Sequence, residues 1–285
     1  MVTVNSVSGG KTSAYIAKHY PADYNIFALV TTNDKGCLYP DAKLRQIVSD
    51  KIGKEFIGTL EMDVIIKTIL DLEQFIGSDI TWVAGIPFDE VIETKGGWLP
   101  NVLYRYCTTH LKMEPIFKWW RDTINEVVDM RIGFRANEQR RAKKMLDKLN
   151  KDGVSEMRAI IGRTKTGTQN SWGDVPWRVP TFPLIDDNIY KDNIDKYWID
   201  KPVPFAELNN CVGCFHRSPI LLKKMWETHT NKMQFFSNQE GGDNGYWRGD
   251  KLTYEDIRKS LKQIELNFED FNTDEYGCDS GECGL

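Results

Sequence analysis

"VNSVSGGKTSAYIAKHY", residues 4–20, sets the pattern for the first half of the chain. Its apolar residues predict a β-strand over about residues 2–7, and the segment 12–20, which Pro21 ends, is typical of a helix. Between them lies the loop Ser8-Gly9-Gly10-Lys11-Thr12-Ser13. A strand that passes through glycines into a helix start presents free backbone N–H groups and the positive helix end to an anion. The loop is therefore predicted to bind phosphate.

The residue types of this loop suit that task. Gly9 and Gly10 let the backbone approach phosphate oxygens closely, Lys11 supplies a cation, and the hydroxyls are donors. A Walker A loop would need its first glycine at position 5, where the chain has Asn5, so that motif is excluded. The remaining alternative is an ordinary strand–turn–helix connection with a serine cap.

Composition indicates a globular protein. The chain has 285 residues, of which 41% are hydrophobic and 27% charged, with a net charge of −4. This balance gives no general nucleic-acid footprint, so such binding would need a local basic patch. With no apolar stretch of membrane-spanning length and no signal-like N-terminus, the expected location is the cytoplasm, without a membrane partner. Oligomeric state stays open, a homo-oligomer included.

Strand-like and helix-like segments alternate over residues 1–145. This alternation predicts an α/β fold with a doubly wound parallel sheet that binds ligands at the carboxyl ends of its strands. Residues 1–200 are expected to form the nucleotide-binding domain, and 201–285 a smaller cysteine-containing subdomain with a tail. Residues 164–183, rich in Gly, Thr, Trp and Pro, are expected to be an irregular lid or substrate loop. Further strands are expected at about 26–30, 55–58 and 130–134, and helices at about 40–52, 62–72, 114–127 and 137–149.

The loop also resembles a known motif. S-G-G-K-T-S is similar to the PP-loop, S-G-G-x-[DT]-S, of the ATP pyrophosphatases and the related phosphoadenosine phosphosulfate (PAPS) reductase family, which includes many phage-encoded proteins. Four further segments resemble that family in its order: RYCTTHLKMEP (105–115), GFRANEQRR (133–141), FPLID (182–186) and CVGC (211–214). The resemblance spans most of the chain. It implies an adenine nucleotide alpha-hydrolase-like fold and, for a phage protein, location in the host cytoplasm.

The resemblance assigns residues to a nucleotide site for ATP or PAPS. An arginine beyond a strand end also suits phosphate recognition on its own physical grounds, because its planar fork binds oxyanions. The alternative for Glu138 and Arg141 is a pair three residues apart on a helix surface. The nucleotide-binding set is Ser8, Gly9, Gly10, Lys11, Thr12, Ser13, Thr32, Asn33, Gly133, Arg135, Glu138 and Arg141.

The cysteine spacing points to a metal. Cys211-x-x-Cys214 and Cys278-x4-Cys283 are pairs, and four thiolates can hold Zn²⁺ or a [4Fe–4S] cluster. The resemblance to cluster-containing adenylyl-sulfate reductases suggests that Cys107 joins Cys211 and Cys214, although Tyr106 replaces the first cysteine of that family's double cysteine. A site made only of the four C-terminal cysteines is the second arrangement, and separate buried thiols are the third.

A second interpretation of Cys283 is that it acts as a nucleophile. The end of the chain, GECGL, resembles the E-C-G-[LI]-H tail of PAPS reductases, whose cysteine attacks the sulfur of the nucleotide sulfate. The terminal histidine is absent, and Cys278 is an additional thiol. Nucleophile and metal ligand are roles that exclude each other.

The ATP-pyrophosphatase form of the loop favours one reaction. ATP with Mg²⁺ is expected to be cleaved to AMP and pyrophosphate, and an acceptor adenylated for sulfur transfer, with Lys11, Arg135 and Cys283 as catalytic candidates. The acceptor is open, a nucleic-acid base included. One alternative is PAPS reduction that releases sulfite through Cys283. The other is a nucleotide-binding, metal-stapled sensor or accessory protein without turnover.

Overall fold

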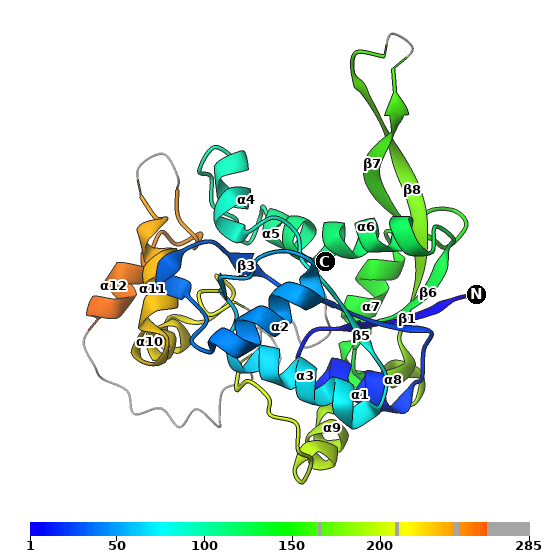
Figure 1. The fold of residues 1–285 in the computed structure, drawn as a ribbon, viewed down its shortest axis with the longest axis horizontal. Helices are drawn as coiled ribbons and strands as arrows, with labels where there is room; N and C mark the ends of the chain where they lie inside the picture. The colour runs from blue at the N-terminus through cyan, green and yellow to red at the C-terminus, as the bar shows by residue number, and fades with distance from the viewer. Residues whose placement is uncertain (165–166, 209–210, 242–244, 261–285) are drawn as a thin grey trace.

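The centre of the protein is a six-stranded sheet with strand order β5-β2-β1-β6-β8-β7 (Figure 1). The computed structural model describes residues 1–164, 167–208, 211–241 and 245–260. All neighbouring strands are parallel except β7, which runs antiparallel to β8. The predicted α/β class with a mostly parallel sheet is therefore confirmed. The strands are β1 (Thr3–Val7), β2 (Tyr24–Ala28), β5 (Ile80–Val83), β6 (Val128–Arg131), β7 (Ser155–Arg163) and β8 (Asn170–Thr181).

Helices cover both faces of this sheet. Successive side chains of a strand point to opposite faces, and those of the inner strands are apolar on both, so both faces need to be covered. Phe27 of β2 packs in one hydrophobic cluster, and its neighbours Ile26 and Ala28 pack in the other. Both faces of the inner strands are apolar, as expected of buried parallel strands. The first cluster includes residues of α1 (Lys11–His19), α2 (Ala42–Ile52), α3 (Val64–Ile76) and α9 (Lys191–Trp198), and the second includes residues of α6 (Glu114–Thr123) and α7 (Gln139–Leu146).

The order of the strands places a topological switch beside β1. From β1 the chain moves outward through β2 to β5, and then returns to pair β6 with the other edge of β1. The connections that leave the carboxyl ends of β1 and β6 therefore turn to opposite sides of the sheet. Open α/β sheets bind ligands in the crevice that this divergence leaves.

Two sequence-based expectations were wrong. The strand expected at 55–58 is not in the main sheet: β4 (Gly58–Thr59) forms a small antiparallel ladder with β3 (Thr31–Thr32). Most of the segment expected to be irregular, 164–183, is the long strand β8. Its Gly and Pro residues suggested a loop, but pairing with β6 on one edge and β7 on the other outweighs their low strand propensity.

Short elements connect the main ones. Among them, α8 is too short to predict from periodicity, and η2 is a π-helical turn that continues into α6. No helix of the described ranges is both long and apolar enough to cross a bilayer. These elements are η1 (Lys35–Cys37), α4 (Phe88–Thr94), α5 (Tyr106–Thr108), η2 (Thr109–Met113), η3 (Ala136–Glu138) and α8 (Pro183–Asp186).

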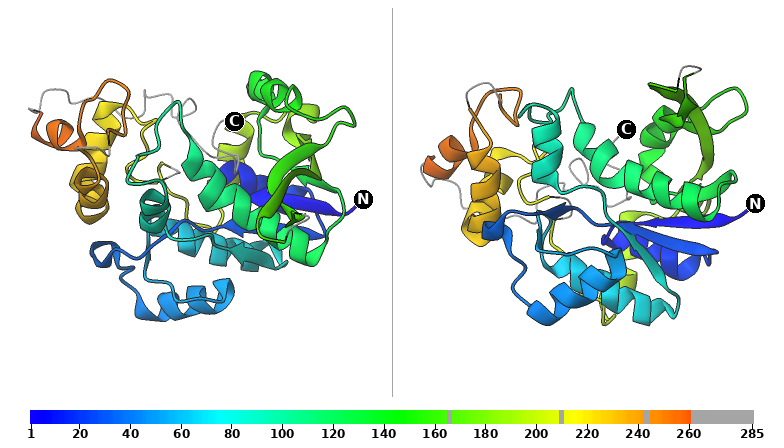
Figure 2. Two further views of the ribbon diagram at one scale, coloured as in Figure 1. Left: turned by 90° about the horizontal axis from the view of Figure 1, so that it is seen from above. Right: turned by 45° about the horizontal axis from the view of Figure 1, so that its top comes forward.

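Three C-terminal helices pack against the α4 side of the protein, away from β8 (Figure 2). They are α10 (Pro219–Thr228), α11 (Thr230–Asn238) and α12 (Tyr254–Lys259). Their apolar residues share one cluster with Val30 after β2, Leu60 after β4 and Phe88 of α4. The described part of residues 201–285 is thus joined to the larger part of the chain through a common core.

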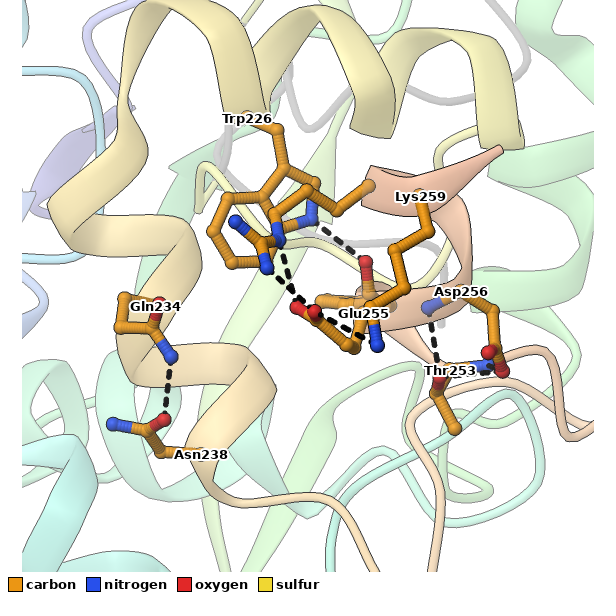
Figure 3. Close-up of polar contacts among 9 residues, drawn as sticks. Trp226, Gln234, Asn238, Thr253, Glu255, Asp256 and Lys259 are labelled. Carbon is orange, nitrogen blue, oxygen red and sulfur yellow. Dashed lines mark hydrogen bonds and ion pairs between the residues drawn. The ribbon is translucent and has the colours of Figure 1, made fainter. Parts of the chain in front are cut away.

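Polar contacts fasten α12 to α10 (Figure 3). The indole N–H of Trp226 donates to the carbonyl of Tyr254 at 2.8 Å, and the Thr253 hydroxyl accepts from the Asp256 backbone N–H at 3.0 Å, which caps α12. Nearby, the Tyr254 backbone N–H donates to Oε2 of Glu240 at 2.6 Å. The other Glu240 oxygen is buried without a hydrogen-bond partner among the described residues. Burial raises the pKa of Glu240 to about 7.

Glu240 should make the stability of the protein depend on pH. A carboxyl group with a raised folded-state pKa stabilises the fold most below its unfolded value and loses this contribution as the pH rises towards the folded value. Glu240→Gln keeps an acceptor for Tyr254 without the charge. We expect the variant's advantage in melting temperature over wild type to grow between about pH 5 and about pH 8. The exposed Glu227→Gln on α10 is the control, and an advantage that does not change with pH would contradict the assignment.

Candidate functional site

The phosphate-binding candidate loop lies at the topological switch. Asn5 of β1 sits beside Arg131 of β6 in the parallel register, so residues 8–10 and 132–135 leave the sheet side by side. These are the segments that hold the predicted loop and the predicted arginine. The fold therefore brings two separate sequence motifs to the same edge of the sheet.

Gly9 has a conformation and a position that require glycine. Its φ is +77°, in the left-handed region, and a Cβ atom there would lie 2.7 Å from Cγ2 of Ile65 on α3. Both the backbone angle and the neighbouring helix exclude a side chain. The turn consequently brings the bare backbone of the loop directly against the helix layer.

Ser13 holds the loop in shape. Its hydroxyl accepts a hydrogen bond from the Ser8 backbone N–H at 3.0 Å and donates to the Gly10 carbonyl at 3.1 Å. The Ser8 hydroxyl lies 3.1 Å from the same oxygen. Ser13 and Thr12 are buried, whereas Lys11 is partly exposed at the start of α1. Ser13 therefore acts within the loop, and Lys11 forms its outward end.

Lys11 is paired with the helix that covers α1. Its ammonium lies 2.7 Å from Oδ1 of Asp195 on α9, and both side chains are about 40% exposed. The indole N–H of Trp198, also on α9, donates to the Lys11 carbonyl at 3.0 Å. Sequence reasoning missed Asp195 and Trp198, because only the fold brings α9 to the loop. The FPLID segment, most of which forms α8, lies directly before α9 in the chain.

Arg135, Glu138 and Arg141 form one charged cluster after β6. Oε2 of Glu138 accepts from the Arg135 backbone N–H and from its side-chain Nε, both at 2.9 Å. The other Glu138 oxygen accepts from Arg141, whose guanidinium lies 4.5 Å from the ring centre of Phe134. Arg135 is buried, so the cluster is more than an ion pair on a helix surface. Gly133 lies buried in the turn that leads into this cluster.

Thr32 and Asn33 donate hydrogen bonds to the start of α4. The Thr32 hydroxyl donates to Asp89 at 2.8 Å, and the Asn33 side-chain amide donates to Glu90 at 2.8 Å. The Asn33 backbone N–H also donates to Asp89, at 2.9 Å. These three donors anchor the start of α4, so in this structure they are not directed at a nucleotide.

A cavity of about 50 Å³, here called the thiol cavity, lies beyond the carboxyl end of β2. Cys107 comes from α5, whereas Cys211 and Cys214 come from the segment before α10. Val30, just after β2, and Phe88 of α4 line it as well. Other polar groups that line the cavity are Arg105, Lys112 and His216. Residues separated by a hundred positions in the sequence therefore surround one space at the same edge of the sheet as the loop.

The thiol cavity is short of solvent, and its titratable groups show this. Burial raises the pKa of Cys107 to about 11, and burial and then the Glu61 carboxylate raise that of Cys211 well above its usual range. Burial lowers the pKa of His216 to about 4, so its imidazole is neutral at pH 7. Its Nε2 is buried and has no hydrogen-bond partner among the described residues. The cavity therefore favours the neutral form of Cys107 and of Cys211.

Glu61 connects the thiol cavity to the sheet, and sequence reasoning missed it. Its side chain is buried, and its Oε1 lies 3.1 Å from the ammonium of Lys112. Burial, the largest single effect, lowers the pKa of Lys112, but the Glu61 carboxylate together with the Cys211 and Cys214 thiols outweighs it, so the pKa is raised overall. The backbone of Glu61 forms a bridge with Cys211, and its carbonyl accepts from Lys232 at 2.5 Å. No spacing in the sequence marks Glu61, because its partners come from three distant segments.

The thiol cavity supplies suitable donors for a soft metal but not a finished site. Three thiols face one space, and thiolates are the ligands that zinc and iron–sulfur clusters prefer. In the part of the chain that the structure describes, no three His, Cys, Asp or Glu side chains are arranged to hold a metal ion. Cys278 and Cys283, the other predicted ligands, lie outside the described residues, as does the predicted nucleophilic role of Cys283.

Comparisons with known proteins add no relative. No protein-family model matches the sequence, and no curated protein or solved structure matches the chain. The interpretation of the site therefore depends on its own geometry and on the motifs of the sequence.

Asp195 should compete with an anion for Lys11. Asp195→Asn removes the carboxylate that holds the ammonium, so we expect ATP to bind more tightly, by up to about fivefold for an exposed ion pair. Calorimetric titration with Mg-ATP measures this. Asp192→Asn, an exposed change on the same helix, is the matched control and should leave affinity unchanged. Equal or weaker binding by Asp195→Asn would show that the carboxylate does not oppose the ligand.

Proposed function

We propose that the protein is a nucleotide-dependent enzyme that binds ATP at residues 8–13, cleaves it to AMP and pyrophosphate, and adenylates an acceptor for sulfur transfer. The observation that carries the proposal is the position of the Ser8–Ser13 motif at the switch beside β1, with Gly9 held in the left-handed region against α3. A glycine turn that enters a helix at such a crevice is a recurrent phosphate site. The PP-loop resemblance names the same residues independently.

The charged groups support pyrophosphate as the leaving group. Lys11 at the outward end of the loop can meet the β- and γ-phosphates once it leaves Asp195. Arg141 is partly exposed beside buried Arg135 and extends the positive charge along the β6 side of the crevice. Fixed cations that face the developing charge stabilise phosphoryl-type transition states. Mg²⁺ bound with the nucleotide would supply further charge neutralisation.

The proposed reaction balances without a redox step. An acceptor oxygen attacks the α-phosphorus, the bond from that phosphorus to the bridging oxygen breaks, and pyrophosphate departs with the electron pair. The acceptor loses its proton to solvent and carries the AMP group. A sulfur nucleophile can then displace AMP. Binding of the reactants in one crevice supplies the orientation that such transfers need.

The thiol cavity supports sulfur chemistry as the purpose of activation. It lies at the carboxyl end of β2, one strand from the loop after β1. Cys107, Cys211 and Cys214 would hold a [4Fe–4S] cluster, or alternatively Zn²⁺, together with a ligand from elsewhere. Either group would convert the neutral thiols to thiolates by displacing their protons. Arg105 and Lys112 line the same space and would balance the negative charge that results.

Lys11→Ala should weaken ATP binding and slow pyrophosphate release, since it removes a direct cation from the phosphates. The expected loss of affinity is about tenfold, in line with a charge-assisted contact. Lys18→Ala on the same helix is the control, because Lys18 lies over the ring of Phe75 and away from the loop. Calorimetry gives the affinity, and a coupled phosphate assay gives the release of pyrophosphate.

The same assays separate the alternatives. Unchanged ATP affinity in Lys11→Ala would contradict the proposed phosphate site. Tight ATP binding without pyrophosphate release under any acceptor would favour the sensor or accessory protein. Sulfite release from PAPS that is lost in Cys283→Ser would favour the reductase.

Metal analysis tests the thiol cavity. Protein purified without oxygen should contain iron and acid-labile sulfide, and Cys211→Ser should lose most of both because a ligand is removed. Cys37→Ala is the control, since Cys37 is buried outside the thiol cavity. One zinc per chain in place of iron would select the Zn²⁺ alternative. A metal-free wild-type protein, or a metal content that Cys211→Ser does not alter, would remove the metal from the proposal.

A further inference from the structure

The hairpin of β7 and β8 extends as an arm beyond the helices that cover the rest of the sheet (Figure 1). Its outer half carries three exposed large apolar side chains, here called the arm tip: Ile160, Ile161 and Trp172. Ile160 pairs with Trp172 across the ladder and shares a face with it, whereas Ile161 lies on the other face, over Gly173. Trp172 is 53% exposed and Ile161 61%. Both faces of the outer arm therefore expose apolar area to water.

A second exposed apolar surface lies between α4 and α5. This apolar loop consists of Trp98, Val102, Leu103 and Tyr104, of which Leu103 is 84% exposed and Trp98 68%. The segment is held in place from within: the Tyr106 hydroxyl donates to the Trp98 carbonyl, and the Asn101 side chain accepts from the Leu103 and Tyr104 backbone N–H groups. Its apolar side chains thus point outward from an ordered backbone.

The two surfaces lie on the same side of the protein. In Figures 1 and 2, the arm and the helices α4 and α5 that bound the apolar loop rise on the same side of the sheet. Contiguous exposed apolar groups of this size mark interaction sites. They come from opposite parts of the sheet order, so each needs cover from another molecule.

Charge makes the two surfaces complementary. The exposed charges of the arm are Glu156 near its base, the weak pair of Arg158 and Asp174 at 3.5 Å, and Arg163 at its outer end, so the outer end is positive. The helix α4, next to the apolar loop, has three carboxylates in seven residues and no basic residue: Asp89, Glu90 and Glu93. An apolar arm with a positive outer end therefore matches an apolar loop beside an acidic helix on the same chain.

We infer that the protein forms a symmetric dimer in which the arm of each copy lies over the apolar loop and α4 of the other. A two-fold axis brings each arm to the opposite loop, so both exposed surfaces of both copies are covered at once. A large aromatic side chain at the end of a projecting arm is the kind of anchor that dominates interface energy. The inference does not depend on the proposed chemistry, although the covered loop ends at Arg105, which lines the thiol cavity.

Sedimentation of the full chain over a dilution series tests the dimer. Wild type should be dimeric at high concentration, and Trp172→Ala and Leu103→Ala should each raise the dissociation constant by about tenfold or more. Ile199→Ala is the matched control, because Ile199 is exposed to a similar degree on the α9 side and should not change the constant. Circular dichroism confirms that each variant is folded.

Charge reversal tests which surfaces meet. Arg163→Glu and Glu93→Arg should each weaken the dimer, and the double variant should recover most of the lost affinity, because the opposite charges are restored between copies. Wild type that stays monomeric at every concentration would overturn the inference and leave the arm to another partner, such as a nucleic acid. A dimer that is indifferent to Trp172 and Leu103 would overturn it as well.

Discussion

The parallel pairing of β1 with strands on both its edges is the constraint on which the site depends. Residues 4–7 of β1 are buried between two helix layers, so the strand can end only where the chain turns sharply out of the sheet. Gly9 makes this turn, and α3 lies too close for any other residue. Because β6 leaves the sheet alongside, residues 8–10 and 132–135 diverge at the same edge, which is where open α/β sheets bind ligands. The position of the proposed phosphate site thus follows from how the sheet is wound.

The helix α9 lies over the first turn of α1, beside the proposed phosphate site. One partly exposed ion pair and one indole hydrogen bond join α9 to the first turn of α1, whereas the inner side of α9 is buried through Ile194 and Trp198. The apolar anchor keeps the helix in place, and the polar contacts can exchange partners at little cost. The arrangement suits a site that must admit and release a highly charged ligand.

Sequence patterns predicted most elements in the first half of the chain. They failed for strands that are defined by hydrogen bonds to strands distant in the sequence. The helices and the strands around β1 and β6 follow from apolar periodicity and from the glycine loop. The strands β5 and β7 were not expected, and β8 was expected to be a loop because of residues such as Gly173 and Pro176, although pairing with its neighbours makes it a strand. For the site, motif matches named Ser8, Lys11 and Arg135, because these residues stand next to glycines at strand ends. Asp195 and Glu61 have no such local mark, and their ion-pair partners lie 184 and 51 positions away.

Glu61 also has a consequence for the order in which the chain can fold. Its buried carboxylate is matched by Lys112, its carbonyl by Lys232, and its backbone by Cys211. A buried carboxylate with incomplete partners costs several kcal/mol, about as much as the whole stability of a marginal domain. During synthesis, the sheet can form early from its local β–α units, but the region around β4 gains its full set of partners only after α11 has left the ribosome. The thiol cavity, which Phe236 and Trp247 help to line, therefore cannot close before this part of the chain has been made.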